Sequence, residues 1–136
     1  MSGFELHERL QQDTLEVGRL ELCRVLLMNN RCFPWLILVP EVANIREIHD
    51  LSDAQQVQLI RESSRVGQAL MTQFQGDKLN VAALGNMVPQ LHVHHIVRFQ
   101  GDPAWPAPVW GTPFNEPYQS AEAAERLAQL RQVLAL

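Results

Sequence analysis

Three of the five histidines lie within four positions of the segment NMVPQLHVHHIVR, residues 86–98. If this segment is a strand, alternate side chains lie on opposite faces. One face then carries Gln90, His92 and His94, and the other carries His95 among apolar residues. Neutral imidazole near pH 7 can attack phosphorus or accept a proton, and two histidines spaced i, i+2 on a strand are also common zinc ligands. The pattern therefore predicts a reactive or binding surface on the face of His92 and His94.

Three interpretations of this surface stay open. A nucleophilic or acid–base role needs one ring nitrogen aimed at the substrate and the other held by an acceptor such as a backbone carbonyl. A metal site needs a third ligand, and the remaining histidines, His7 and His49, lie in no acid–histidine motif. Hydrogen-bonded histidines without a chemical role are the third interpretation. His95, on the apolar face, is expected to be a buried histidine with satisfied hydrogen bonds.

The composition indicates one folded domain over residues 1–136. With 46% hydrophobic and 19% charged residues the chain can bury one core, and it does not resemble a disordered protein. A net charge of −4 does not suit nucleic-acid binding. No apolar run approaches the roughly 20 residues of a membrane helix, and no signal-peptide pattern opens the sequence. We therefore expect a cytoplasmic protein with no nucleic-acid or membrane partner, in which Cys23 and Cys32 are buried, reduced thiols.

The elements that would position the histidines follow from caps, turns and apolar runs. Three helices are expected: a short one opened by the capping box SGFE (2–5), a long one from the Ser52–Gln55 capping box to about residue 74, and one that begins at Ser120. Four strands are expected, in two hairpins: 22–28 with 32–40, and 78–84 with 90–99. Because short turns join the strands of each hairpin, the pairing must be antiparallel. The expected class is α+β, with an antiparallel sheet and helices packed on one face.

The histidine segment resembles the signature of the histidine-triad (HIT) nucleotide hydrolases and transferases. In that family Val-Pro precedes H-x-H-x-H, then come apolar residues and often an arginine. Anchoring on Val-Pro at 88–89 and on Arg98 places the triad positions at Gln90, His92 and His94. Glutamine in the first position is similar to a bacterial branch of the family. The order of the hairpin, the long helix and the histidine strand also resembles that of HIT proteins.

The resemblance implies a two-layer fold with a sheet of about five strands, usually paired into a homodimer. It also implies chemistry on the α-phosphate of a nucleotide, which would be a phosphoramidate, a phosphate ester or a dinucleoside polyphosphate. The middle histidine of the family forms a nucleotidyl-histidine intermediate, and this role falls on His92. His94 and Gln90 would hold phosphoryl oxygens, and neither a metal nor a cofactor is implied.

Four further residues are expected to contact the substrate. Asn86 stands where the family usually has glutamine, and Asn80 is the nearest amide to a shortened phosphate loop. Asn29, or Asn30 beside it, lies near the position that holds the ribose hydroxyls in the family. Arg98 is expected to reach a phosphate or to lie on the surface.

Two other functions remain as alternatives. Gln90 can donate and accept hydrogen bonds but carries neither a proton nor a positive charge. A nucleotide-binding module with little or no turnover is therefore the first alternative, and a metal-dependent hydrolase that uses His92 and His94 is the second. The loop GDPAWPAPVWG (101–111) resembles the tail of the bacterial branch, and Trp105 and Trp110 are expected to pack rather than to stack on a base.

Overall fold

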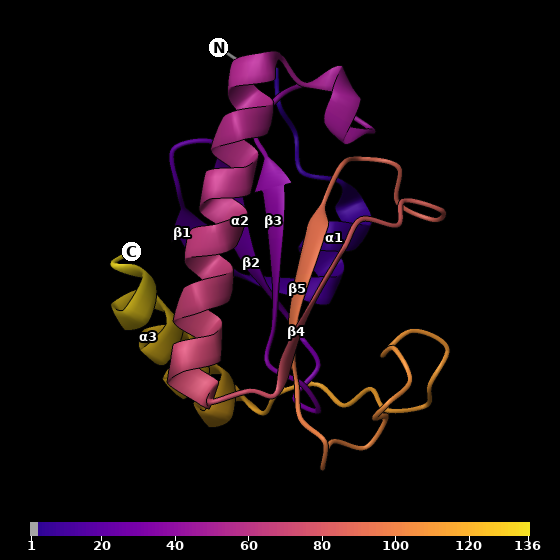
Figure 1. The fold of residues 1–136 in the computed structure, drawn as a ribbon, viewed down its shortest axis with the longest axis vertical. Coiled ribbons are helices and arrows are strands. Elements are labelled where there is room, and N and C mark those ends of the chain that lie inside the picture. The colour runs from indigo at the N-terminus through magenta and orange to yellow at the C-terminus, as the bar shows by residue number, and fades with distance from the viewer. Residues whose placement is uncertain (1–2) are drawn as a thin grey trace.

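The computed structural model describes residues 3–136 (Figure 1). Within these residues the strands are β1 (Thr14–Arg19), β2 (Cys23–Met28), β3 (Trp35–Pro40), β4 (Lys78–Ala82) and β5 (Val93–Arg98). The helices are α1 (Glu8–Asp13), α2 (Asp53–Phe74) and α3 (Ser120–Leu134), with a 3-10 turn η1 (Ile48–Asp50) before α2. No helix in this part of the chain is both long and apolar enough to pass through a bilayer.

The five strands form one antiparallel sheet in the order β1-β2-β3-β5-β4. Strand β5, which carries the histidines, is therefore held on both sides by neighbouring strands. His94 lies opposite Ile37 of β3 and Ala82 of β4. This arrangement confirms the predicted α+β class, and both predicted hairpins are present.

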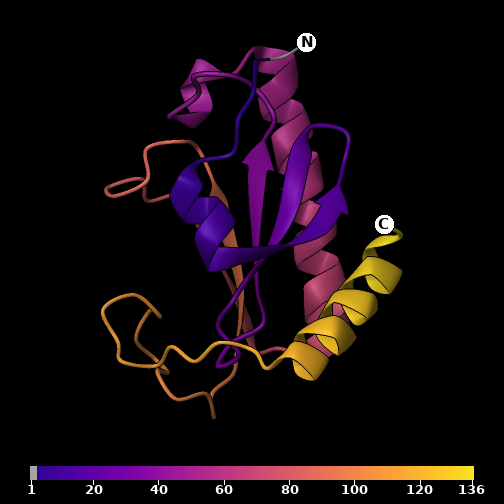
Figure 2. The ribbon, with the colours of Figure 1, turned by 180° about the vertical axis from the view of Figure 1, so that it is seen from behind.

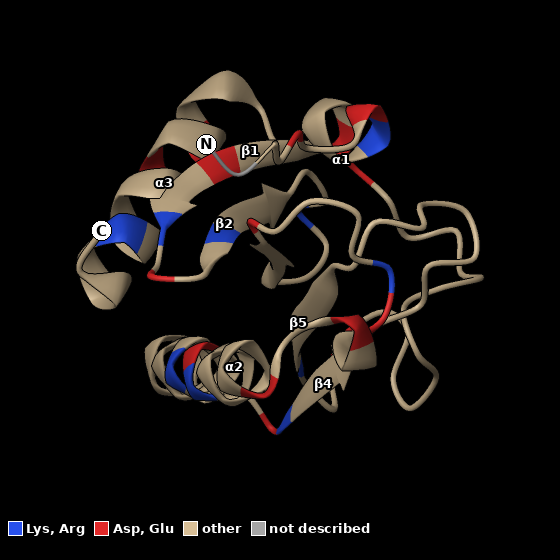
Figure 3. Ribbon diagram, turned by 90° about the horizontal axis from the view of Figure 1, so that it is seen from above, with Lys and Arg blue, Asp and Glu red and all other residues tan. Residues whose placement is uncertain are grey.

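One face of the sheet is covered by α2 and α3, which lie on the same side of it (Figures 1 and 3). Helix α2 buries Leu59, Val66 and Leu70 in a core cluster that also holds Leu130 and Leu134 of α3. Burial of such side chains contributes about 1.5–3 kcal/mol each and holds the two layers together. Ile60 is 60% exposed, because the buried face of α2 follows Leu59 instead.

The opposite face carries α1 and the loop 101–118 (Figure 2). Leu10 of α1 packs there with Phe33, Trp35 and Ile37, and the loop adds Val109. The sheet therefore has a second apolar cluster on the side away from α2. The site described below lies on this side.

The capping box predicted for the long helix is confirmed. The Ser52 hydroxyl accepts from the backbone N–H of Gln55, and the Gln55 side chain accepts from the backbone N–H of Ser52. The predicted box in SGFE concerns Ser2, which lies outside the described residues. Helix α1 begins later than expected, at Glu8, because the His7 ring accepts from the backbone N–H of Arg9 and caps it.

Candidate active site

His92 and His94 lie together beside a cavity on the face of the sheet opposite α2. Their ring centroids are 4.9 Å apart, with an angle of 72° between the planes. Both are buried, at 7% and 4% exposure, so the two rings do not lie on an open face of the sheet. They line a cavity of about 330 Å³, hereafter the histidine cavity, whose other walls include Ile37 of β3 and the turn 84–88. The two rings can therefore meet a small ligand without facing bulk solvent.

The contact of the His92 ring determines which of its nitrogens is reactive. Its Nδ1 lies 2.7 Å from the backbone carbonyl oxygen of Gln90. Because a carbonyl only accepts, Nδ1 carries the hydrogen and Nε2 of the neutral ring keeps its lone pair. Burial lowers the pKa of His92 below 6.5, although the bond to Gln90 opposes this shift. At neutral pH the ring is therefore an uncharged imidazole with a nucleophilic Nε2.

His94 is enclosed by aromatic rings. The Trp35 indole donates from Nε1 to His94 Nδ1 over 3.0 Å. Trp35 and Trp110 both meet the His94 ring edge-on, with centroids 5.6 Å and 5.0 Å away. Burial, followed by the nearby rings of His92 and His95, lowers the pKa of His94 to about 3. His94 therefore stays neutral throughout the physiological range.

His95 points the other way, toward α2, as the alternation predicted. It is fully buried, and its Nδ1 donates to the Val93 carbonyl over 3.1 Å. Its Nε2 then accepts from the Ser63 hydroxyl of α2 at 2.7 Å. The prediction of a buried histidine with satisfied hydrogen bonds is confirmed.

Gln90 does not lie in the histidine cavity. Its side-chain oxygen accepts from the backbone N–H of His7, and its amide nitrogen donates to the Glu5 carbonyl, each over 2.8 Å. The side chain lines a separate hollow between the N-terminal segment and residues 43–46. The predicted common face for Gln90 and the two histidines was wrong, because β5 begins only at Val93 and strand alternation does not extend back to residue 90.

Arg98 is a structural residue in this fold rather than one that faces the cavity. Its guanidinium, 2% exposed, donates to both carboxylate oxygens of Asp102 at 2.8 and 3.0 Å, and to the side-chain oxygen of Asn80 at 3.0 Å. It also lies over the rings of Phe33 and Trp105. Neither Arg98 nor Asn80 lines the histidine cavity. The structure thus contradicts the predicted phosphate contact of Arg98 and gives the Asn80 amide a different partner.

Asp102 holds the start of the loop 101–111, which carries Trp105 and Trp110. Besides Arg98, it accepts from the backbone N–H groups of Phe99, Ala104 and Trp105. Burial opposes ionisation of Asp102, but these hydrogen bonds outweigh it and lower its pKa to about 2. Removing one partner of such a buried ion pair typically costs about 3–5 kcal/mol, so the loop is firmly held.

A second cavity of about 490 Å³, hereafter the outer cavity, adjoins the histidine cavity. Its separate walls are formed by Asn29 and Asn30 after β2 and by residues 111–117 of the loop. The walls that both cavities share include Met28 and Trp110. The two cavities therefore lie side by side, and together, as the binding region, they have room for a ligand longer than a phosphate.

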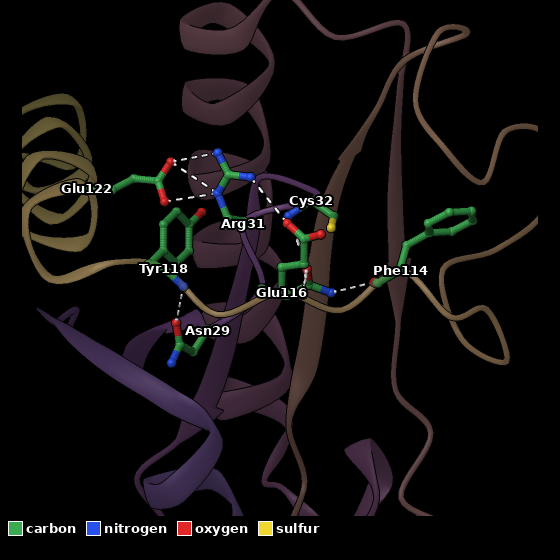
Figure 4. Close-up of polar contacts among 8 residues, drawn as sticks. Asn29, Arg31, Cys32, Phe114, Glu116, Tyr118 and Glu122 are labelled. Atoms are coloured by element: carbon green, nitrogen blue, oxygen red, sulfur yellow. Dashed lines mark hydrogen bonds and ion pairs between the residues drawn. The ribbon is translucent and has the colours of Figure 1, made fainter.

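Asn29 and Asn30 anchor the loop that lines the outer cavity, and Figure 4 shows the contact of Asn29 with Tyr118. The Asn29 side-chain oxygen accepts from the backbone N–H of Tyr118 over 2.9 Å. The Asn30 amide donates to the Phe114 carbonyl, and its oxygen accepts from the backbone N–H of Glu116. Asn29, which is predicted to contact the substrate, lines the outer cavity, and one of its two polar side-chain atoms is used by the protein. Asn86, in the turn 84–88, lines the histidine cavity.

The sequence reasoning missed three residues of the binding region: Arg9, Trp35 and Trp110, of which Trp110 had been expected only to pack. Among residues 3–136, Arg9 is the one lysine or arginine that lines either cavity, and it lines both. Its guanidinium is half exposed and contacts Asp13 at 3.3 Å across one turn of α1. No sequence pattern marks Arg9, because an i, i+4 Arg–Asp pair is common on any exposed helix.

A metal site that uses His92 and His94 would need a third ligand nearby. Within residues 3–136, no three His, Cys, Asp or Glu side chains are grouped so that they could bind one metal ion. Apart from the two histidines, the polar residues that line the histidine cavity are Arg9, Asp13 and Asn86.

Comparisons with known proteins agree on one family. The family model for the HIT domain matches residues 9–101. A histidine triad protein from Marinobacter aquaeolei is 56% identical, with a TM-score of 0.95 over 97% of this chain and 96% of that chain. A histidine triad protein from Bradyrhizobium japonicum is 46% identical, with a TM-score of 0.93 over 96% and 98% of the two chains.

More distant structures share the fold alone. A hypothetical histidine triad nucleotide-binding protein from Sulfolobus tokodaii is 14% identical, with a TM-score of 0.68 over 90% of this chain and 84% of that chain. The comparison with curated proteins gives no match. The family match covers more than half of the chain and includes both cavity histidines, so this protein belongs to the histidine triad (HIT) family.

Proposed function

We propose that the protein is a hydrolase or transferase that acts on the α-phosphate of a nucleotide, with His92 as the nucleophile. The observation that carries the proposal is the state of the His92 ring at the cavity wall. Its Nδ1–H is held by the Gln90 carbonyl, and its Nε2 keeps a lone pair at neutral pH. This is the arrangement that attack on phosphorus requires.

The reaction proceeds in two displacements. His92 Nε2 forms a bond to the α-phosphorus while the bond from phosphorus to the leaving group breaks, and the leaving group departs with that electron pair. Water then attacks the same phosphorus and loses its proton to solvent. The nitrogen–phosphorus bond breaks, which releases a nucleoside monophosphate and restores the neutral imidazole.

The size and lining of the two cavities support a nucleotide as the ligand. The α-phosphate would occupy the histidine cavity beside His94 and Asn86, and the nucleoside would occupy the outer cavity beside Asn29. Arg9 stands between them and would supply the positive charge that two neutral histidines do not. Gln90 would act through its backbone carbonyl, which holds His92.

The test is turnover of adenosine 5′-phosphoramidate and of diadenosine polyphosphates, with rapid quenching to trap a nucleotidyl-histidine. We expect the wild-type protein to release nucleoside monophosphate and to carry the nucleotide on residue 92. We expect His92→Ala to lose release of product by at least about 10³-fold, because removing a nucleophile leaves only binding.

His49→Ala is the matched control, because this side chain is 82% exposed and lies outside both cavities. It should turn over as the wild type does. Nucleotide binding by the wild type with neither turnover nor a trapped intermediate would indicate a binding module. Unchanged turnover by His92→Ala would refute the mechanism.

A further inference from the structure

Trp35 makes a hydrogen bond whose direction admits one assignment only. An indole N–H donates and cannot accept. Since Trp35 Nε1 lies 3.0 Å from His94 Nδ1, that ring nitrogen must be the acceptor and must carry no hydrogen. The neutral His94 ring therefore keeps its proton on Nε2. This is the reverse of His92, whose Nδ1 carries the hydrogen.

The surroundings of His94 hold the ring in this orientation. The Trp35 side chain is 6% exposed, and it meets Trp110 edge-on with centroids 5.9 Å apart and planes at 88°. His94 fits between these two indoles and the His92 ring. A flip of the His94 ring would replace the acceptor nitrogen with a carbon and leave the buried indole N–H without a partner, which typically costs about 1–3 kcal/mol.

The second nitrogen of His94 is open toward the cavity. His94 lines the histidine cavity, and the buried side-chain atoms that lack a partner in residues 3–136 are on Tyr118 and Arg126 only. Nε2 of His94, which makes no hydrogen bond within that part of the chain, is therefore accessible to a ligand. The cavity wall thus presents a lone pair from His92 next to an N–H from His94.

We propose that Trp35 is a positioning residue that holds His94 as a fixed Nε2–H donor to the phosphoryl group attacked by His92. The catalytic part of this inference rests on the proposed function. A donor fixed before the reaction stabilises the oxygen on which negative charge grows during attack. If the proton instead moved to Nδ1, the same ring would turn a lone pair toward that oxygen and repel it. Trp35 acts through His94 in this role.

The test is Trp35→Phe, which keeps an aromatic ring in the buried position and removes the N–H. We expect the ¹⁵N resonances of His94 in the full-length protein to change from one fixed tautomer to a mixture. We also expect kcat to fall by roughly 10- to 100-fold while KM changes little, because the lost interaction belongs to the transition state. A loss that is merely structural would not move the His94 resonances in this way.

Trp110→Phe is the matched control for the ring resonances. It retains an aromatic contact with His94 and leaves the Trp35 N–H in place, so the His94 tautomer should stay as in the wild type. Trp105→Phe is the control for activity, because Trp105 lies beside Arg98 and lines neither cavity.

The outcomes separate this inference from the proposed function. In the wild type, Nδ1 of His94 must give the resonance of an unprotonated ring nitrogen. A protonated Nδ1 would overturn the inference, even if Trp35→Phe fails to fold. An altered tautomer with unchanged kcat would also overturn it. A changed tautomer in a protein that never turns over nucleotides would instead refute the proposed function and leave the hydrogen-bond assignment intact.

Discussion

At the scale of single residues, the three histidines of the motif differ in what their ring nitrogens touch. His92 donates to a carbonyl, His94 accepts from an indole, and His95 uses both nitrogens inside the core. Each partner sets a tautomer, and burial keeps all three rings neutral. Identical side chains thus present a free Nε2 lone pair, a free Nε2–H and a structural link.

The pH dependence of turnover should report His92. Only the neutral ring can attack, and burial lowers its pKa, so kcat/KM should be constant near neutrality and decline only as the pH falls below 6.5. His94 should add no second decline there, because its pKa is about 3. We expect this profile from initial rates measured between about pH 5 and pH 8.

His49→Gln is the control for the pH profile, since His49 is exposed and should leave it unchanged. A decline centred above 6.5 would show that the titrating group is not a buried His92.

The sequence predicted the position of a side chain where only neighbouring residues determine it. It did not do so where residues distant in sequence determine it. Alternation along a strand correctly separated His95 from His94. Alternation gave the wrong position for Gln90, because its side chain is hydrogen-bonded to the backbone of Glu5 and His7. Neither expected position of Arg98, at a phosphate or on the surface, is observed, since a basic residue at this place looks the same in sequence whether it faces a ligand, solvent or Asp102. The Trp35–His94 bond joins residues 59 positions apart and leaves no local pattern.

At the scale of elements, β1 was the one strand of the sheet not expected from the sequence. A register shift between Glu16 and Gly18 interrupts its pairing with β2. The residues on either side of this bulge therefore do not follow a simple alternation of apolar and polar positions. By contrast, the long helix was predictable because its cap is encoded by residues only three apart, Ser52 and Gln55.

Helix α1 places Arg9 and its ion-pair partner Asp13 beside both cavities, and substitutions of these two residues should change KM in opposite directions. The Arg9–Asp13 pair is half exposed and its contacts are long, at 3.3 and 3.4 Å, so a phosphate can replace the carboxylate. We expect Arg9→Gln to raise KM by roughly 5- to 10-fold with kcat little changed. Asp13→Asn should lower KM, because it frees the guanidinium and removes a like charge.

Steady-state kinetics at low and high salt would check both changes, and the difference between variants should shrink as salt screens the charges. Arg61→Gln on the exposed side of α2 is the matched control. If Arg9→Gln and Asp13→Asn change KM in the same direction, the pair does not act on substrate charge.

At the scale of the whole molecule, apolar side chains are exposed at the edge of the sheet formed by β4. Strand β4 is an edge strand, and Val81, Leu84 and Met87 on or just after it are 51%, 52% and 83% exposed. An apolar edge of this kind invites pairing with another chain. We propose that it joins two copies of the protein as a homodimer.

We expect the wild-type protein to elute as a dimer in size-exclusion chromatography with light scattering, and Val81→Lys to shift it toward the monomer. A charge buried in such an interface is costly unless it is paired. Ile48→Lys in η1 changes an exposed apolar residue that is not part of β4 and should leave the dimer intact. A monomeric wild type would rule out this assembly.

The packing of Trp35 and Trp110 around His94 has a practical consequence. Two of the three tryptophans in the chain line the region where a ligand would enter. Indole emission responds to local polarity and to quenching groups in contact, so the protein carries its own optical reporter. Ligands can therefore be screened by intrinsic fluorescence, without a label and without knowing beforehand which molecule binds.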